Sequence, residues 1–240
     1  FAIRFGWITP PPRPALESAR ETLTFLHAIT AEGTITPHGR SIASLGTHPR
    51  LGTLATVARA RSLESLGAQL ITILEERDIL GPTSPTSTIH ARLNALSGSG
   101  RRAAGAHRLG EMSERWSDRI RSLPPPASRN PYTSSEEDAV ALLLASAFPE
   151  RIARRREEGS HRYLLASGKG AALKAGDPLR QAEFIVACSV QDSGAELSIR
   201  LAAPLSPDLF KTELAHLVTQ SREVRVDPKT GALTSSQRTK

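Results

Sequence analysis

The chain has 240 residues, 39% of them hydrophobic and only 4% aromatic, so its cores must be built from Leu, Ala, Ile and Val. It has no run of about 18 apolar residues, the length that a membrane-spanning helix needs, and a single cysteine, Cys188, excludes a disulfide framework. The formal net charge of +7 favours a polyanionic partner such as RNA or DNA. Codon bias is the alternative origin of this charge, because only five of the 31 basic residues are Lys.

The beginning of the chain has no signal-peptide pattern, because no charged segment precedes an apolar run. Together with the single cysteine, this favours a reducing cytoplasm as the location. The first residue is Phe, so we expect the chain to be a piece of a longer protein.

The first half of the chain predicts helices separated by Pro, Gly and Ser. An amphipathic helix is expected over residues 15–29, after the stiff segment PPPRP. Thr36 and Pro37 have the pattern of an N-cap and a first helical residue, and Pro49 is expected to begin a further helix. Ser62 is expected to cap the helix after that. A later long helix is predicted from one apolar face, formed by Leu109, Met112, Trp116, Ile120 and Leu123.

The second half of the chain changes from helical to strand periodicity. Residues 124–131, PPPASRNP, form the clearest linker, and Ser134 with Glu137 matches a capping box for the helix that follows. Beyond Pro149, alternating apolar residues predict the strands of a small β-barrel or sheet. A helix is then expected to begin at Ser206, before a hairpin with Asp-Pro-Lys-Thr-Gly as its turn.

No pattern typical of catalysis or metal binding is present in the sequence. The run SGKG, residues 167–170, lacks the first glycine and the final Ser or Thr of a phosphate-binding loop, so it predicts a turn with Lys169 at its tip. The seven histidines have no ligand spacing to a carboxylate or to Cys188. Cys188 lies on the apolar face of a predicted strand, so we expect a buried thiol rather than a nucleophile.

Several stretches resemble a known helicase family. The early segment has the pattern "G-x-[LI]-T-x-x-G-R" followed by "L-x-x-x-P-R-L", which is similar to the helicase-associated segment of bacterial DEAH-box helicases. The stretches FPERIARRR, HRYLLASGKGAAL, ELSIRLAAPL and EVRVDPKTGAL resemble the C-terminal region of the HrpB branch. The residues that carry the early pattern are Gly33, Ile35, Thr36, Gly39, Arg40, Leu45, Pro49, Arg50 and Leu51.

The resemblance implies a multidomain α+β fold. Residues 1–48 would form a winged-helix-like segment, and residues 49–123 a helical bundle of the ratchet type. Residues 124–134 would be a Pro-rich linker, and residues 135–205 a β-barrel module similar to an OB-fold. Residues 206–240 would begin a C-terminal α/β extension typical of HrpB.

The resemblance also implies a function. Members of this family use ATP and Mg²⁺ to translocate 3′ to 5′ on single-stranded RNA or DNA. The catalytic motifs lie in two RecA-like motor domains and are absent from this sequence, so we expect no bound cofactor and no ATPase activity from this chain alone. Its expected role is to bind the strand and close the channel over the motor domains, without a membrane partner.

The candidate phosphate contacts are the basic residues around the predicted first strand of the barrel, namely Arg154, Arg155, Arg156, Arg162 and Lys169. Strand alternation places Arg154 and Arg156 on one face and Arg155 on the other, so not all three can reach one groove. Tyr163 is the candidate stacking partner. Arg40 and Arg50 lie in family motif positions, where contacts with the motor domains, with nucleic acid or with a helix end are alternatives.

Two other functions remain open at the level of the sequence. The chain could be a docking module for the motor domains or for an activating partner. It could also be a winged-helix regulator that places residues 35–45 in a DNA major groove, although this helix offers only Arg40 and Ser41 as polar contacts.

Overall fold

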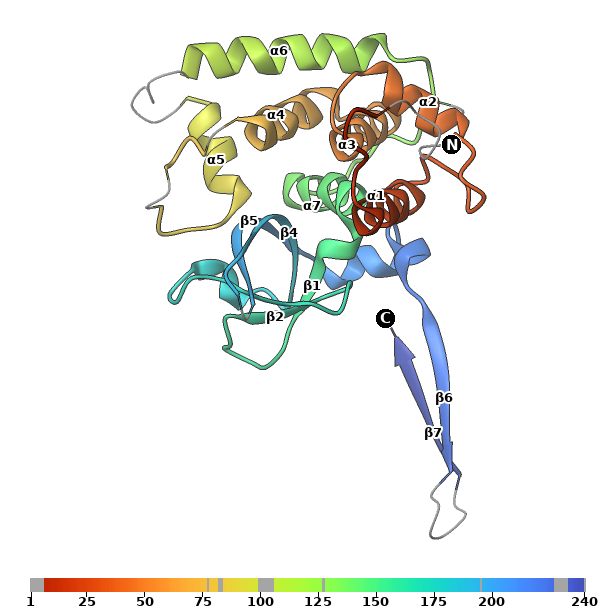
Figure 1. Ribbon diagram of the computed structural model, residues 1–240. Coiled ribbons are helices and arrows are strands. Elements are labelled where there is room, and N and C mark those ends of the chain that lie inside the picture. The colour runs from red at the N-terminus through yellow and green to blue at the C-terminus, as the bar shows by residue number, and fades with distance from the viewer. Residues whose placement is uncertain are drawn as a thin grey trace.

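The computed structural model describes residues 7–76, 78–81, 84–98, 106–126, 128–194, 196–226 and 233–239. Its helices lie in layers above a small barrel, and a two-stranded hairpin extends away from both (Figure 1). This arrangement confirms the predicted change from a helical first half to a β-module after about residue 150. The helices are α1 (Arg13–Phe25), α2 (Pro37–Ser44), α3 (Pro49–Arg61), α4 (Glu64–Glu75), α5 (Ile89–Leu96), α6 (Ala106–Ser122) and α7 (Glu136–Ala147).

Five strands close the barrel in the order β1-β2-β3-β5-β4, with antiparallel pairs except for the parallel pair β3 and β5. The strands are β1 (Ile152–Arg155), β2 (Arg162–Leu165), β3 (Gly170–Ala172), β4 (Phe184–Asp192) and β5 (Leu197–Leu205). Short 3-10 helices are η2 (Pro149–Arg151), η3 (Pro178–Gln181), η4 (Pro207–Lys211) and η5 (Ala215–Leu217), and the hairpin pairs β6 (Gln220–Val226) with β7 (Leu233–Thr239). The predicted hairpin is therefore confirmed, while its predicted turn lies outside the described residues.

Two of the predicted helix starts are confirmed. Thr36 is the N-cap of α2, and its side chain accepts a hydrogen bond from the backbone N–H of Gly39. Pro49 is the first residue of α3, where its missing N–H costs nothing. The first helix, by contrast, already ends at Phe25, because the chain turns at His27 with a positive φ of 52°.

Other local predictions were wrong. Ser62 does not cap α4 but ends α3 in the left-handed conformation, since the two helices are joined by a very short turn. The cap of α7 is Ser135 rather than Ser134, because the Ser135 hydroxyl accepts from the N–H of Asp138. The segment after Ser206 forms two short 3-10 helices instead of one α-helix.

One of the two hydrophobic cores joins the helical bundle to the outer side of the barrel, and the other fills the barrel interior. Helix α7 is buried along most of its length and lies between α3 and the strands β4 and β5 (Figure 1). Strand β4 is buried on both faces: Val186 and Cys188 pack toward the helices, while Ile185 and Ala187 belong to the barrel interior. Burial on both sides removes the usual solvent-facing alternation and joins the two parts into one packed unit.

Polar contacts fasten the same junction. Asp177 is fully buried and accepts hydrogen bonds from the N–H groups of Ser87 (2.7 Å) and Leu179 (2.9 Å). The carbonyl of Ser87 in turn accepts from the N–H of Ala202 on β5 at 2.8 Å. The loop before α5 is therefore held on the barrel wall. Among the described residues, no helix is long and apolar enough to cross a membrane.

Close packing of α3 against α4 gives a stability prediction. A Cβ added to Gly67 would stand 2.5 Å from the Cβ of Ala58, whereas one added to Gly110 on α6 meets nothing within 4 Å. We expect Gly67→Ala to lower the free energy of unfolding by about 2 kcal/mol through overpacking. The matched change Gly110→Ala should raise it by up to about 1 kcal/mol, since Ala is the better helix former. Urea unfolding followed by circular dichroism measures both; equal effects would contradict the packing argument.

Candidate nucleic-acid interface

The outer face of strands β1, β2 and β3 is a shallow basic surface. Arg154, Leu164 and Gly170 lie opposite one another across the three strands. Because side chains alternate between the two faces of a strand, Arg162 and its partner Ala172 share this outer face. Leu164 is 47% exposed, and Gly170 and Ala172 beside it have little or no side chain. We call this surface, with Arg156 and Lys169 at its border, the barrel outer face.

Arg156 and Lys169 border this face from two loops. Arg156 follows β1, and its N–H still bonds the carbonyl of Arg162 at 3.0 Å, which places the two arginines side by side. Its guanidinium lies above Gly170, with Nη2 2.9 Å from where a Cβ on that glycine would stand. Lys169 lies in the turn between β2 and β3, which the positive φ of Gly168 (84°) allows, and is exposed. The predicted turn at the SGKG run is thereby confirmed.

Arg155 has a different position from its neighbours. Its Nη1 donates to the carbonyl oxygens of Arg180 (2.7 Å) and Gln181 (3.0 Å), so it covers one end of the barrel. Arg154 is exposed, but it pairs with Glu183 at 3.1 Å and its guanidinium lies 5.6 Å from the ring centroid of Phe184. Among the predicted phosphate contacts, the Arg155 side chain is thus held by structural hydrogen bonds. The Arg154 side chain already has a carboxylate partner in Glu183.

Tyr163 does not stack on a nucleobase at this surface, contrary to the sequence-based prediction. Its side chain is fully buried inside the barrel, where its hydroxyl donates to the carbonyl oxygens of Leu179 and Ala182. Burial raises the pKa of Tyr163 to about 12. Trp116, on the predicted apolar face of the long helix, lies in the core as well: it is 5% exposed, and its Nε1 donates to Glu75 at 3.0 Å.

The two motif arginines lie apart from the barrel outer face. Arg50, in the first turn of α3, is 8% exposed and bonds both carboxylate oxygens of Glu150, at 2.7 and 3.0 Å. Its Nη1 also donates to the carbonyl of Ala147 at 2.9 Å, so it joins α3 to the end of α7. Arg40 is exposed on α2, and its only side-chain hydrogen bond among the described residues reaches the carbonyl of Ile35 at 3.5 Å.

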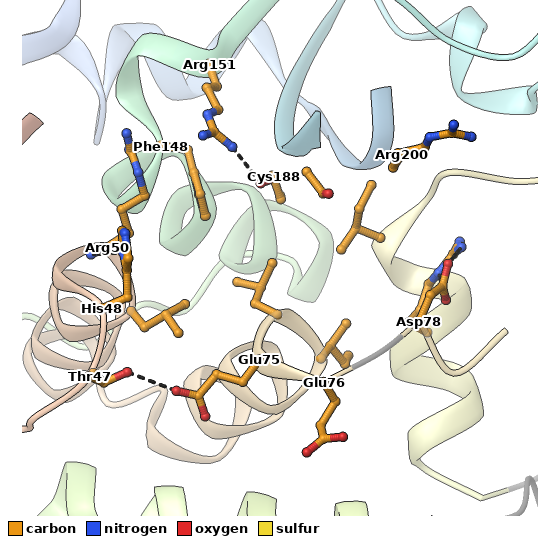
Figure 2. Close-up of a pocket in the computed structure, with 16 residues that line it drawn as sticks. Thr47, His48, Arg50, Glu75, Glu76, Asp78, Phe148, Arg151, Cys188 and Arg200 are labelled. Carbon is orange, nitrogen blue, oxygen red and sulfur yellow. Dashed lines mark hydrogen bonds and ion pairs between the residues drawn. The ribbon is translucent and has the colours of Figure 1, made fainter. Parts of the chain in front are cut away.

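A cleft with a volume of about 520 Å³ lies between the bundle and the barrel (Figure 2). Its polar side chains are engaged within the protein: Thr47 donates to Glu75 at 2.9 Å, and Arg151 donates to the carbonyl of Cys188 at 3.0 Å. Burial, together with the charge of the neighbouring Arg50, lowers the pKa of both His48 and Arg151. These contacts indicate that the cleft is part of the interface between the bundle and the barrel rather than a binding site.

Cys188, at the wall of this cleft, behaves as the sequence predicts. It is 4% exposed, and burial raises the pKa of its thiol to about 12, so it stays protonated and unreactive near neutral pH. No group of three or more His, Cys, Asp or Glu side chains that could hold a metal occurs within the described ranges.

Three residues on or beside the barrel outer face were not among the sequence-based candidates: Leu164, Gly170 and Glu196. Glu196, directly before β5, pairs with Arg162 at 3.2 Å between Oε2 and Nε. Alternation along HRYLLAS could have placed Leu164 outward next to the inward Tyr163. The pairing of Leu164 with Gly170 and of Arg162 with Glu196 depends on strand register, for which the sequence has no local signal.

Comparisons with known proteins support the motif-based resemblance. No family model matches the chain. Over 239 residues it is 29% identical to ATP-dependent RNA helicase HrpB of Escherichia coli (strain K12), a match that covers 98% of this chain and 26% of the relative. Two solved structures, described as E. coli DExH-box NTPase HrpB and Escherichia coli DEAH/RHA helicase HrpB, are each 28% identical, with TM-scores of 0.78 and 0.73. They cover 100% and 98% of this chain, which spans about a quarter of their length.

Proposed function

Because the chain is homologous to HrpB over nearly its whole length, we propose that it is the C-terminal accessory region of an ATP-dependent, 3′ to 5′ DEAH-box RNA helicase. In this proposal it binds single-stranded RNA or DNA on the barrel outer face and closes the channel over the motor domains. The motor domains, with their ATP and Mg²⁺, would lie in the remaining part of the protein, in the cytoplasm. The chain alone would not hydrolyse ATP.

The strand order of the barrel supports its assignment as an OB-fold. A closed five-stranded barrel with the order β1-β2-β3-β5-β4 has the connectivity of that fold, whose β2–β3 face and β1–β2 and β4–β5 loops bind oligonucleotides. Arg156 lies at the beginning of the β1–β2 loop, Arg162 begins β2, and Lys169 precedes β3. The basic residues therefore lie where an OB-fold binds a strand.

The single observation that carries the proposal is the pair of cations without a carboxylate partner. Within the described part of the chain, Arg156 and Lys169 form no ion pair, whereas most arginines of the bundle do. Both border the exposed Leu164, an apolar surface on which a base or a ribose can rest. Unpaired cations supply the phosphate contacts that binding of a strand without sequence preference requires.

Salt dependence tests this function. We expect the chain to bind a fluorescent single-stranded RNA of about 12 nucleotides, a length within the range of one OB-fold. The logarithm of the binding constant should fall linearly with the logarithm of salt concentration, with a slope of about −1.4 for two phosphate contacts, one each from Arg156 and Lys169. Fluorescence anisotropy at several KCl concentrations gives the slope. Absence of binding at low salt, or preference for a particular duplex DNA sequence, would contradict the proposal.

The N-terminal segment favours a second, compatible role in docking. Helix α1 has no buried residue, while Phe25 at its end is 57% exposed and Ile35 is 44% exposed. An amphipathic helix without a covered face is typical of a segment that packs on another domain. The short bridge between Ile29 and Ile35 and the capped helix α2 are consistent with the winged-helix-like segment of the helicases, which we propose contacts the motor domains.

A further inference from the structure

The barrel outer face contains a carboxylate at the point where a polyanion is expected to bind. Glu196 directly precedes β5, and its side chain is 21% exposed. One of its oxygens, Oε2, is held by the Arg162 guanidinium at 3.2 Å. The other, Oε1, stands 3.3 Å from the position that a Cβ on Gly170 would take. A carboxylate here repels phosphate, so it lowers the affinity for any nucleic acid unless it gains a hydrogen bond in return.

Arg156 and Glu196 place a donor and an acceptor side by side over Gly170. Arg156 Nη2 lies 2.9 Å, and Glu196 Oε1 3.3 Å, from the same imaginary Cβ. A side chain at Gly170 would collide with Arg156, so glycine lets the two groups lie this close to the backbone. A group that both accepts from a guanidinium and donates to a carboxylate can therefore bridge these two side chains.

The chemistry of the nucleic-acid backbone identifies such a group. The sugar-phosphate backbone of DNA offers only acceptors, whereas each nucleotide of RNA carries a 2′-hydroxyl that donates as well. The 2′-hydroxyl and the phosphate on the neighbouring 3′ carbon of one ribonucleotide are adjacent. They can therefore meet Glu196 and Arg156 together.

We infer that Glu196 accepts the 2′-hydroxyl of a bound ribonucleotide and makes the barrel outer face prefer RNA over DNA. The inference rests on the proposed strand binding and names the sugar that this surface selects. Arg162 acts as a positioning residue, because its ion pair fixes the carboxylate with Oε1 turned toward Gly170. The repulsion between carboxylate and phosphate weakens DNA binding, and the hydrogen bond from the ribose offsets it for RNA alone.

A pair of probes with the same base isolates the sugar. Oligo(U) and oligo(dU) of about 12 nucleotides differ only in the 2′-hydroxyl, and both fit the site size of one OB-fold. We expect the unaltered chain to bind oligo(U) about tenfold more tightly, the value of one charge-assisted hydrogen bond. Oligo(U) with 2′-O-methyl groups, which cannot donate, should bind like oligo(dU). Fluorescence anisotropy at one fixed salt concentration measures all three.

Two variants on the same face separate recognition from general electrostatics. Glu196→Ala should bring the ratio of RNA to DNA affinity to about one. Glu183→Ala removes a carboxylate that pairs with Arg154 on the same outer face, away from Gly170. It should change both affinities by the same factor and keep the ratio.

The outcomes distinguish this inference from the proposed function. If the unaltered chain binds neither probe, strand binding itself fails. If it binds both equally, or if Glu196→Ala changes both affinities by the same factor, strand binding stands and the recognition of ribose by Glu196 is overturned. A loss of preference in Glu196→Ala that is absent in Glu183→Ala supports the inference.

Discussion

Reversing the charge of Arg156 and Lys169 together, in the variant Arg156→Glu/Lys169→Glu, should weaken binding of single-stranded RNA by about a hundredfold at low salt. Each residue is expected to make one charge-assisted contact with a phosphate, and two contacts of about 1.4 kcal/mol give this factor. Both side chains are exposed and form no ion pair within the described part of the chain, so their replacement leaves the barrel core intact. The slope of affinity against salt should fall as well.

The control for this variant lies on the far side of the molecule. Arg115 and Arg121 are exposed on α6, above the bundle and away from the barrel (Figure 1). Arg115→Glu/Arg121→Glu changes the net charge by the same amount. It should lower the affinity by no more than about threefold, through the general field of the protein. Equal losses in the two variants would show that net charge, and not the barrel outer face, governs binding.

The second large effect is expected at the junction between the bundle and the barrel. Arg50→Ala should lower the free energy of unfolding by about 3 kcal/mol, because it leaves the Glu150 carboxylate and the Ala147 carbonyl without their main donor in a largely buried place. Since the core of the bundle extends onto the helix-facing side of β4 and β5, one cooperative transition should report this loss. Urea unfolding followed by circular dichroism measures it.

A double-mutant cycle shows whether the pair itself is responsible. Arg50→Ala/Glu150→Ala should regain part of the loss of Arg50→Ala, because no unpaired carboxylate remains. As a control, Arg13→Ala removes a surface pair with Glu17, in which the side chains are 90% and 62% exposed. Such a pair contributes well under about 1 kcal/mol. If Arg50→Ala costs as little as Arg13→Ala, the structural role of Arg50 is refuted.

Local features of the fold could be predicted wherever one or two residues determine them. The capping hydroxyl of Thr36 and the fixed φ of Pro49 act on their own segment, so these helix starts are readable from the sequence. The predicted cap of α7 was wrong by one residue, because Ser134 and Ser135 are chemically equivalent candidates for the N-cap. The predicted cap at Ser62 was wrong, because the short turn between the packed helices α3 and α4 places Ser62 in the left-handed conformation.

In the candidate site, too, one feature is predictable from the sequence and another depends on the tertiary structure. Alternation along a strand separates Arg155 from Arg154 and Arg156, and this is a property of the sequence alone. Which of the two faces is outward depends on the neighbours: Tyr163, opposite Arg155, fills the barrel, so Arg155 turns to its end.

By itself, the sequence determined the helical first half, the small barrel after residue 150, the positive charge and the resemblance to HrpB helicases, because these rest on residue type and short-range spacing. Only the tertiary structure decided which cations stay unpaired and which become structural. Arg50 meets Glu150 a hundred residues away, and Glu196 meets Arg162 and Gly170 through strand pairing. Such contacts arise when distant segments close on one core, and no local pattern records them.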